Sequence, residues 1–395
     1  MAERSIPISF PSSGEPRNAP VAEPIELSTT FCFPDSMSIV DFAEGRLAGA
    51  HEYRRYSSPN IDAVEKRLAK LEGAEAALVF PSGMCAEAMT FIGLLKKIKG
   101  PCEVLIAQDC YRRTRELLDN EIPHPGITRV VVPNDELNNI EKYITPNTKI
   151  AFFESPTNPY LRVIDFEYLA GLGKMFGFTT IVDSTFGSPS NQLPLEAGID
   201  LVIHSATKYL GGHNDVLMGL LAGKSEIVDS IRLSRGTWGT LPSPQEAWLL
   251  SRSLETFFPR MRDQNASGME VARFLESHPF VERVWYPGLP SHPDHEVASR
   301  QMSGFGGVIS FEYNGDWRQT ADFVDRVVSS GIASLGASFG ACRGLIEQPM
   351  VMSYWNYTPE QRETIGIKDN LVRYSVGTEC GPQEIIPVLE QALKV

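Results

Sequence analysis

Short, continuously apolar segments alternate with helical segments between residues 61 and 203. These segments lack the alternation of polar and apolar residues that marks a strand with one face in water. Each therefore predicts a strand that is buried on both faces, with the intervening helices as its cover. The alternation predicts an α/β fold with a mostly parallel central sheet. The predicted strands cover residues 76–80, 104–106, 128–132, 149–153, 179–182 and 201–203.

The C-terminal part of the chain follows a different pattern. Its two long helices are expected to meet an interruption at Pro259, because proline lacks the backbone N–H that a helix interior needs. A smaller α+β domain should follow. Its expected elements are helices over residues 245–258 and 263–277, a strand over 307–313, and helices over 322–328 and 383–393.

The pattern also predicts three regions. Residues 1–60 are rich in Pro, Ser and Arg and show little periodicity, which is typical of an extended arm with short ordered pieces. An arm of this length is expected to pack on a neighbouring subunit. We expect a cofactor-binding α/β domain over residues 61–255, which begins with a helix that Gly73 ends, and an α+β domain over residues 256–395.

The charge balance and the termini exclude several classes of function. The net charge is 36 − 49 = −13, which opposes binding to nucleic acid or to anionic lipid. No apolar run approaches the length of a membrane span, and the N-terminus lacks the apolar core of a secretory signal. Six scattered cysteines without a Cys-x-x-Cys pair predict reduced thiols, so we expect a cytoplasmic protein. His292 and His295 lack an evident third ligand, and we expect no metal site.

Lys208 follows the last predicted strand after a small turn that carries two hydroxyls, Ser205 and Thr207. A strand can hold such a lysine on a rigid element, and the hydroxyls can hold an anion nearby. This arrangement suits a lysine that forms a Schiff base with pyridoxal 5′-phosphate (PLP). The alternative for any single lysine is a solvated side chain at the end of a strand.

Other strand ends carry residues suited to the same cofactor, because ligands bind at the carboxyl ends of strands in such sheets. Ser82, Gly83 and Met84 lead from a strand into a helix, whose free N–H groups can bind phosphate. Asp183 could pair with a protonated pyridine nitrogen, and Tyr111 could stack on the ring. The alternatives are an ordinary turn, a helix cap and a core tyrosine.

Arg373 lies inside an apolar segment, Leu371 to Val376. A guanidinium in such a place needs a partner, and the carboxylate of a substrate can bind it in bidentate fashion. A structural salt bridge is the alternative.

Together these motifs resemble the Cys/Met-metabolism family of PLP enzymes, from about Pro20 to the C-terminus. The resemblance implies the fold-type I transferase fold, which is aspartate-aminotransferase-like. It implies that Lys208 forms the Schiff base, that Ser205, Thr207 and the Ser82–Met84 turn hold phosphate, and that Asp183 pairs with the ring nitrogen. It places Asn158, in the sequence from Glu154 to Pro159, near the 3′-oxygen of the ring.

The arm has a counterpart in the family as well. Tyr53-Arg54-Arg55 resembles the family's Tyr-x-Arg segment, whose side chains reach the phosphate of a neighbouring subunit. The resemblance therefore implies shared active sites in a homodimer or homotetramer.

The finer resemblance is to the plant and fungal cystathionine γ-synthase branch, through residues 348–355 and 369–373. The chain departs from that branch at Arg343, where an acid is usual. Arg343 would disfavour an incoming amino group and favour an anion, unless it merely faces solvent.

We expect γ-replacement on an O-acetyl- or O-succinyl-L-homoserine through a vinylglycine ketimine. Lys208 and Tyr111 would move protons, while Arg373 and the backbone near Ser334 hold the carboxylate. The nucleophile would be a thiol or a carbon nucleophile such as a β-keto acid. The alternatives are a γ-lyase, which releases ammonia and a keto acid, and a catalytically inactive relative that binds a metabolite or partner.

Overall fold

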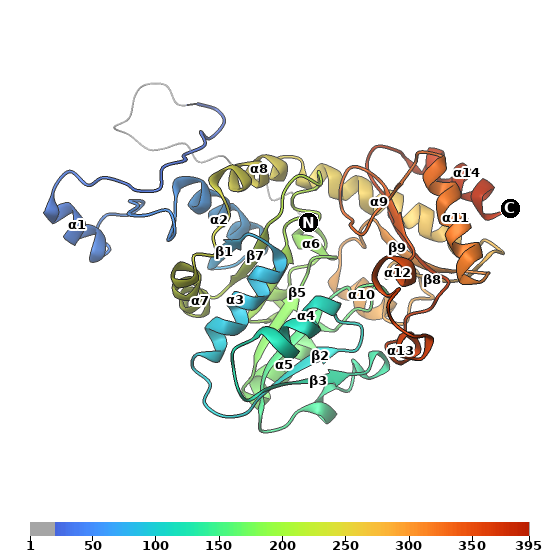
Figure 1. Ribbon diagram of the computed structural model, residues 1–395, viewed down its shortest axis with the longest axis horizontal. Coiled ribbons are helices and arrows are strands. Elements are labelled where there is room, and N and C mark those ends of the chain that lie inside the picture. Colours follow the sequence, from blue (N-terminus) through green and yellow to red (C-terminus); the bar gives the residue numbers. More distant parts are fainter. Residues whose placement is uncertain (1–19, 395) are drawn as a thin grey trace.

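The computed structural model describes residues 20–394, and a seven-stranded sheet forms the centre of its larger part (Figure 1). The strand order is β1-β7-β6-β5-β4-β2-β3. Strands β3, β2, β4, β5 and β6 run parallel, whereas β7 runs antiparallel to both β6 and β1. The strands are β1 (Ala76–Phe80), β2 (Cys102–Ala107), β3 (Ile127–Val132), β4 (Thr148–Glu154), β5 (Thr179–Asp183), β6 (Leu201–Ser205) and β7 (Gly219–Gly223).

This sheet confirms the predicted mostly parallel α/β fold and each of its six predicted strands. Strand β7 was not predicted. Its sequence, Gly-Leu-Leu-Ala-Gly, has a glycine at each end and no β-branched residue, so it lacks the usual composition of a strand. All five of its residues are nevertheless buried between β1 and β6.

Helices cover both faces of the sheet, as the apolar strands require. Alternate side chains of a strand point to opposite faces. Thus Leu78 and Phe80 pack with α3 and α7, whereas Val79 packs with α2 and α8 on the other side. Helix α5 covers that second face over β4 and β5. The helices of this part are α2 (Pro59–Glu72), α3 (Gly83–Leu95), α4 (Arg112–Glu116), α5 (Phe166–Phe176), α6 (Ser188–Asn191), α7 (Ser225–Trp238) and α8 (Pro244–Leu254).

A five-stranded sheet of order β10-β11-β12-β9-β8 forms the smaller part. Its core packs against α9, α11 and α14. Pro259 does not interrupt α9, contrary to the prediction, because it lies in the first turn, where a proline leaves no hydrogen bond unmade. The elements are α9 (Phe257–Glu276), β8 (Val281–Trp285), α10 (His295–Gln301), β9 (Val308–Tyr313), α11 (Trp317–Ser329), β10 (Ser334–Leu335), β11 (Leu345–Glu347), α12 (Pro349–Ser353), α13 (Pro359–Thr364), β12 (Leu371–Ser375) and α14 (Pro382–Leu393).

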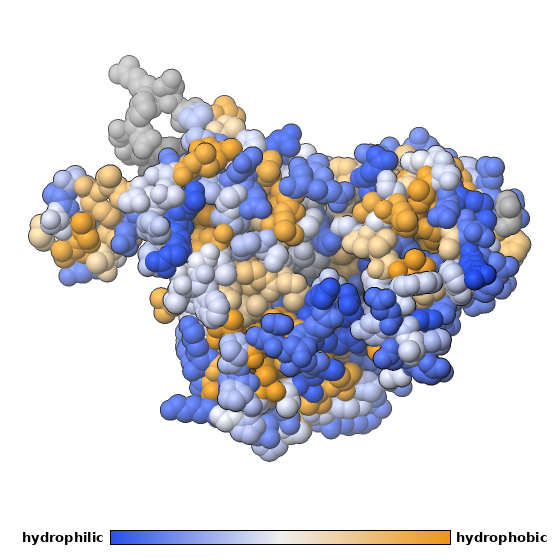
Figure 2. All heavy atoms as spheres, viewed as in Figure 1, coloured by the Kyte–Doolittle hydropathy of each residue, from blue (hydrophilic) through white to orange (hydrophobic). Residues whose placement is uncertain are grey.

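The described part of the arm extends away from the body and carries α1 (Ser36–Ala43), which buries none of its residues (Figure 1). Met37, Ile39 and Val40 are exposed on it, and Figure 2 shows hydrophobic residues on this projection. The exposed apolar side chains need a partner surface. Within residues 20–394, no helix is long and apolar enough to cross a membrane, and no group of acidic, His and Cys residues could hold a metal ion.

Candidate active site

A cavity of about 310 Å³ lies at the carboxyl ends of β4, β5 and β6. Strands β11 and β12 of the smaller sheet contribute Glu347 and Arg373 to its wall. The structure brings most of the predicted site residues together here. Those that line the cavity are Ser82, Gly83, Met84, Tyr111, Asn158, Asp183, Ser205, Thr207, Lys208 and Arg373.

Lys208 is held in the cavity by the turn that follows β6. Its backbone N–H donates to the carbonyl of Ser205 at 3.1 Å, and its Nζ donates to Oγ of Ser338 at 2.8 Å. Burial and the nearby positive charge of Arg373 lower the pKa of Lys208 to about 8. The side chain therefore has an appreciable neutral fraction near neutral pH, and a neutral amine is nucleophilic.

Asp183 ends β5 and has two other carboxylates near it. One of its oxygens accepts the N–H of Thr185 at 2.8 Å. Burial raises the pKa of Asp183, and Glu87 and Glu154 lie in the same cavity wall. Burial also raises the pKa values of Glu87 and Glu154, and the negative charge of Asp183 raises both further. This end of the cavity therefore favours a ligand that carries positive charge.

The part of the cavity wall where α3 begins favours an anion instead. Ser82 caps the helix, since its Oγ accepts the N–H of Cys85 at 3.1 Å. A Cβ on Gly83 would lie 3.0 Å from Cβ of Ser205, so a glycine lets the start of α3 approach the end of β6. The helix start, Ser205 and Thr207 thus share one part of the wall. Free backbone N–H groups and hydroxyls at a helix start suit phosphate.

Tyr111 stands at the opening of the cavity, with 43% of its surface exposed. Its backbone N–H donates to Oε1 of Glu154 at 2.5 Å, which ties the start of α4 to the end of β4. Burial raises the pKa of the phenol. The phenol therefore keeps its proton at neutral pH and can donate it within the cavity.

Arg373 contacts two side chains of the protein and keeps further N–H donors for a ligand. Its Nη2 lies 3.0 Å from Oε1 of Glu347, and its Nη1 donates to Oδ1 of Asn158 at 2.9 Å. The alternative of a structural salt bridge is thus present in the structure. A guanidinium has five N–H donors, so further donors remain for a ligand carboxylate in the cavity.

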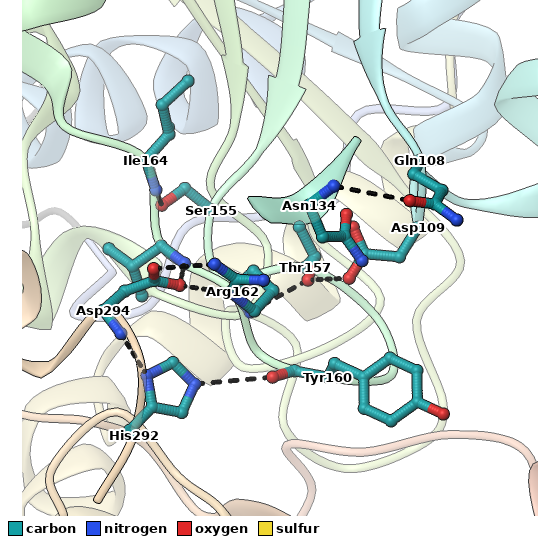
Figure 3. A network of polar contacts seen from close by, with 11 residues as sticks. Gln108, Asp109, Asn134, Ser155, Thr157, Tyr160, Arg162, Ile164, His292 and Asp294 are labelled. Carbon is teal, nitrogen blue, oxygen red and sulfur yellow. Dashed lines mark hydrogen bonds and ion pairs between the residues drawn. The ribbon is translucent and has the colours of Figure 1, made fainter. Parts of the chain in front are cut away.

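A buried polar network behind the cavity fixes the loop that carries Asn158 (Figure 3). Thr157 Oγ1 donates to Asp109 at 2.5 Å, which links this loop to the segment before Tyr111. The backbone N–H of Arg162 donates to the Thr157 hydroxyl at 2.9 Å. The guanidinium of Arg162 binds the carboxylate of Asp294 at 2.6 and 3.0 Å. Burial raises the pKa of Asp109 to about 6. The network therefore joins two cavity loops to the segment before α10.

Four predicted residues lie outside the cavity wall: Tyr53, Arg55, Ser334 and Arg343. Arg55 donates to the carbonyl of Gly236 at 2.5 Å, and Tyr53 is exposed on the arm. Arg343 is exposed, and its Nε donates to Oγ of Ser334 at 2.7 Å. Water screens an exposed guanidinium, so the structure favours the alternative in which Arg343 faces solvent.

Several residues of the wall were not predicted as site residues: Glu87, Glu154, Phe186, Ala337, Phe339, Glu347 and Ser353 among them. Glu347 had a usable signal, because an acid at the end of an apolar segment is the same kind of anomaly that identified Arg373. Phe339 could not be found this way, since a phenylalanine in the core gives no such signal.

Comparisons with known proteins show the family of the chain. The model of the Cys/Met metabolism PLP-dependent enzyme family matches residues 7–394. The chain belongs to this family. It is 41% identical to chloroplastic cystathionine γ-synthase 1 of Arabidopsis thaliana over 91% of this chain, and it spans only 63% of the length of that relative. It is 39% identical to cystathionine γ-lyase of Sus scrofa, over 95% of this chain and 89% of the relative.

A solved structure extends the likeness to the whole fold. The crystal structure of metB from Corynebacterium glutamicum has a TM-score of 0.86 and 34% identity, and the match covers 95% of this chain and 93% of that chain. The fold is therefore the fold-type I arrangement of this enzyme family, as predicted.

PLP, the cofactor of this family, fits the charges of the cavity. The carboxylate of Asp183 suits the pyridine nitrogen, and the helix start with Ser205 suits the phosphate. Lys208 has the lowered pKa that an amine needs to bind the aldehyde. The bound cofactor supplies an electron sink for charge that develops on a substrate carbon.

Proposed function

We propose that the chain catalyses γ-replacement on an O-activated L-homoserine, with O-acetyl- or O-succinyl-homoserine as the substrate. The observation that carries the proposal is that Lys208, Asp183 and Arg373 meet in one cavity. Arg373 binds the carboxylate of the amino acid beside Lys208. Lys208 then removes the α-proton and moves protons along the substrate, while Asp183 stabilises positive charge at the cofactor nitrogen.

The nucleophile that replaces the ester is the second part of the proposal. The synthases among the relatives support a thiol, which gives a cystathionine-like thioether. A second candidate, an anionic carbon nucleophile such as a β-keto acid, rests only on the positive charge of Arg343, which water screens because the side chain is exposed. The lyases among the relatives support the alternative of γ-elimination through the same residues.

Product analysis separates these reactions. The PLP-loaded protein is incubated with O-acetyl- and O-succinyl-homoserine, with cysteine and a β-keto acid as nucleophiles, and the products are weighed by mass spectrometry. A replacement product with either nucleophile supports the proposal, and its mass identifies the nucleophile. Ammonia and a keto acid formed equally fast without any nucleophile would show a γ-lyase instead.

The shared site is also part of the proposal. We propose a homodimer or homotetramer in which Tyr53 and Arg55 of one subunit reach the cofactor phosphate of the next. The exposed apolar side chains of α1 and the position of Tyr53 and Arg55 outside the cavity of their own chain support this arrangement.

A further inference from the structure

Glu347 is a carboxylate of the cavity to which the proposed reaction assigns no task. It ends β11 directly opposite Arg373 of β12, so the two side chains leave neighbouring strands on the same face. The Glu347 side chain is only 4% exposed, yet it lines the cavity. Burying a carboxylate is costly unless its partners compensate for the lost water. Glu347 lies beside Arg373, the proposed ligand of the substrate carboxylate, and this position points to a chemical role.

One of the two oxygens of Glu347 is free. Oε1 lies 3.0 Å from Arg373, whereas Oε2 is buried and has no hydrogen-bond partner among residues 20–394. The charged groups that face this carboxyl are Arg373 and Lys208. Burial raises the pKa of Glu347, and these two cations oppose the rise. A buried oxygen without a partner in a cavity wall can accept a hydrogen bond from a ligand.

Ser338 contacts both Lys208 and Arg373, the residue that pairs with Glu347. Its hydroxyl accepts from Nζ of Lys208 at 2.8 Å, and its carbonyl oxygen lies 3.4 Å from Nη2 of Arg373. The same Nη2 contacts Glu347. An α-amino acid carries its ammonium and its carboxylate on one carbon. A substrate whose carboxylate binds Arg373 therefore brings its ammonium between Lys208 and Glu347.

We infer that Glu347 accepts the proton that the substrate ammonium must lose. The inference rests on the proposed function, because the substrate amine has to be neutral before it can replace Nζ of Lys208. An N–H bond of the ammonium breaks, an O–H bond forms at Oε2, and no other reactant is needed. The neutral acid then competes less with the substrate carboxylate for Arg373. One proton transfer thus frees the amine and releases the guanidinium for the substrate.

Proton counting by calorimetry tests this inference. The PLP-loaded protein is titrated with L-norvaline, which has the ammonium and carboxylate of a substrate but no leaving group. The titrations are run at about pH 9, where the freed Lys208, with its pKa of about 8, stays neutral and takes up no proton itself. Buffers of different ionisation enthalpy then give the number of protons released to the buffer. We expect the wild type to release close to none, because Glu347 keeps the proton. Glu347→Gln should release about one per site and bind at least about tenfold more weakly.

Two further variants make the outcome decisive. Glu312→Gln removes another buried, ion-paired glutamate of the same sheet, outside the cavity, and should behave as the wild type. Glu347→Asp keeps an acceptor on a shorter side chain, so it should bind more weakly and still release no proton. If Glu347→Gln does not fold, this aspartate variant decides, and binding equal to the wild type then contradicts the inference.

The inference is overturned if the wild type releases one proton, or if Glu347→Gln releases none. The proposed function fails separately. A protein that shows the expected proton counts but makes no replacement product from either ester keeps the inference and loses the proposed function. A protein that makes a replacement product but releases the same number of protons in the wild type and in Glu347→Gln keeps the proposed function and loses the inference.

Discussion

The environment of Lys208 changes the chemistry of its side chain. Its pKa of about 8 results from burial and from the positive charge of Arg373, both of which disfavour the ammonium form. As the pH rises through this value, the side chain loses its proton and becomes nucleophilic. An unperturbed lysine would need a pH of about 10.4 for the same change.

The rate at which the cofactor-free protein takes up PLP should therefore rise with pH up to about 8 and level off above it. Stopped-flow absorbance with a series of buffers measures this rate. Nα-acetyl-lysine, treated in the same way, should continue to rise to about pH 10.4. A protein profile that follows the free lysine compound would show that the cavity does not lower the pKa of Lys208.

The proposed effect of Arg343 depends on a single positive charge. If it favours an anionic nucleophile, Arg343→Glu should raise the ratio of thiol product to carbon product about tenfold, which corresponds to about 1.4 kcal/mol. Competition between cysteine and a β-keto acid, with both products weighed, measures the ratio. Arg318→Glu makes the same charge change on α11 and should leave the ratio unaltered. An unchanged ratio in Arg343→Glu would assign Arg343 to solvent.

At the scale of elements, the polar network behind the cavity joins the two loops that carry Tyr111 and Asn158 to the segment before α10. Both Arg162 and Asp294 are largely buried, at 13% and 5% exposed side-chain surface. Removing one charge leaves the other without its partner in a dry environment, which destabilises more than the loss of a surface pair.

Asp294→Asn should therefore lower the free energy of unfolding by about 3 kcal/mol. Urea denaturation, followed by fluorescence and by circular dichroism, measures the change. Glu255→Gln breaks a half-exposed ion pair with Arg67 and should cost less than about 1 kcal/mol. Equal losses in the two variants would show that the network adds no more to stability than a surface contact.

The elements also show what a sequence can predict. Buried strands such as β4 and β5 were predictable, because their apolar runs have no other stable place in a fold. The glycine-bounded β7 was not, since its position between β1 and β6 depends on packing. The meeting of Lys208, Asp183 and Arg373 at one cavity was predictable, because each is a polar group at an apolar strand. The pairing of Glu347 with Arg373 was not, because it depends on the register of two strands that are separated by α12 and α13.

The whole molecule has a surface that its own chain does not cover. The arm carries α1 away from the body, and its apolar side chains face outward (Figures 1 and 2). Tyr53 and Arg55, which the family resemblance assigns to a phosphate site, lie outside the cavity of their own chain. The proposed active site shared between subunits would account for both observations.

Hybrid oligomers test this arrangement. Lys208→Ala and Arg55→Ala chains, each weakly active or inactive alone, are co-expressed with different tags, and the doubly tagged oligomers are purified. Each hybrid dimer contains one site with both Lys208 and a neighbour's Arg55, so we expect about half of the wild-type activity per dimer. Activity no greater than that of the separate variants would mean that Arg55 serves its own chain or no site.

The most direct test of the whole account is the covalent attachment of PLP to Lys208. The loaded protein is reduced with borohydride and digested, and its peptides are sequenced by mass spectrometry. The account predicts a pyridoxyl-phosphate group on Lys208, with no adduct and no absorbance band of the bound aldehyde in Lys208→Ala. A reduced adduct on a different lysine, or none in the wild type, would contradict it.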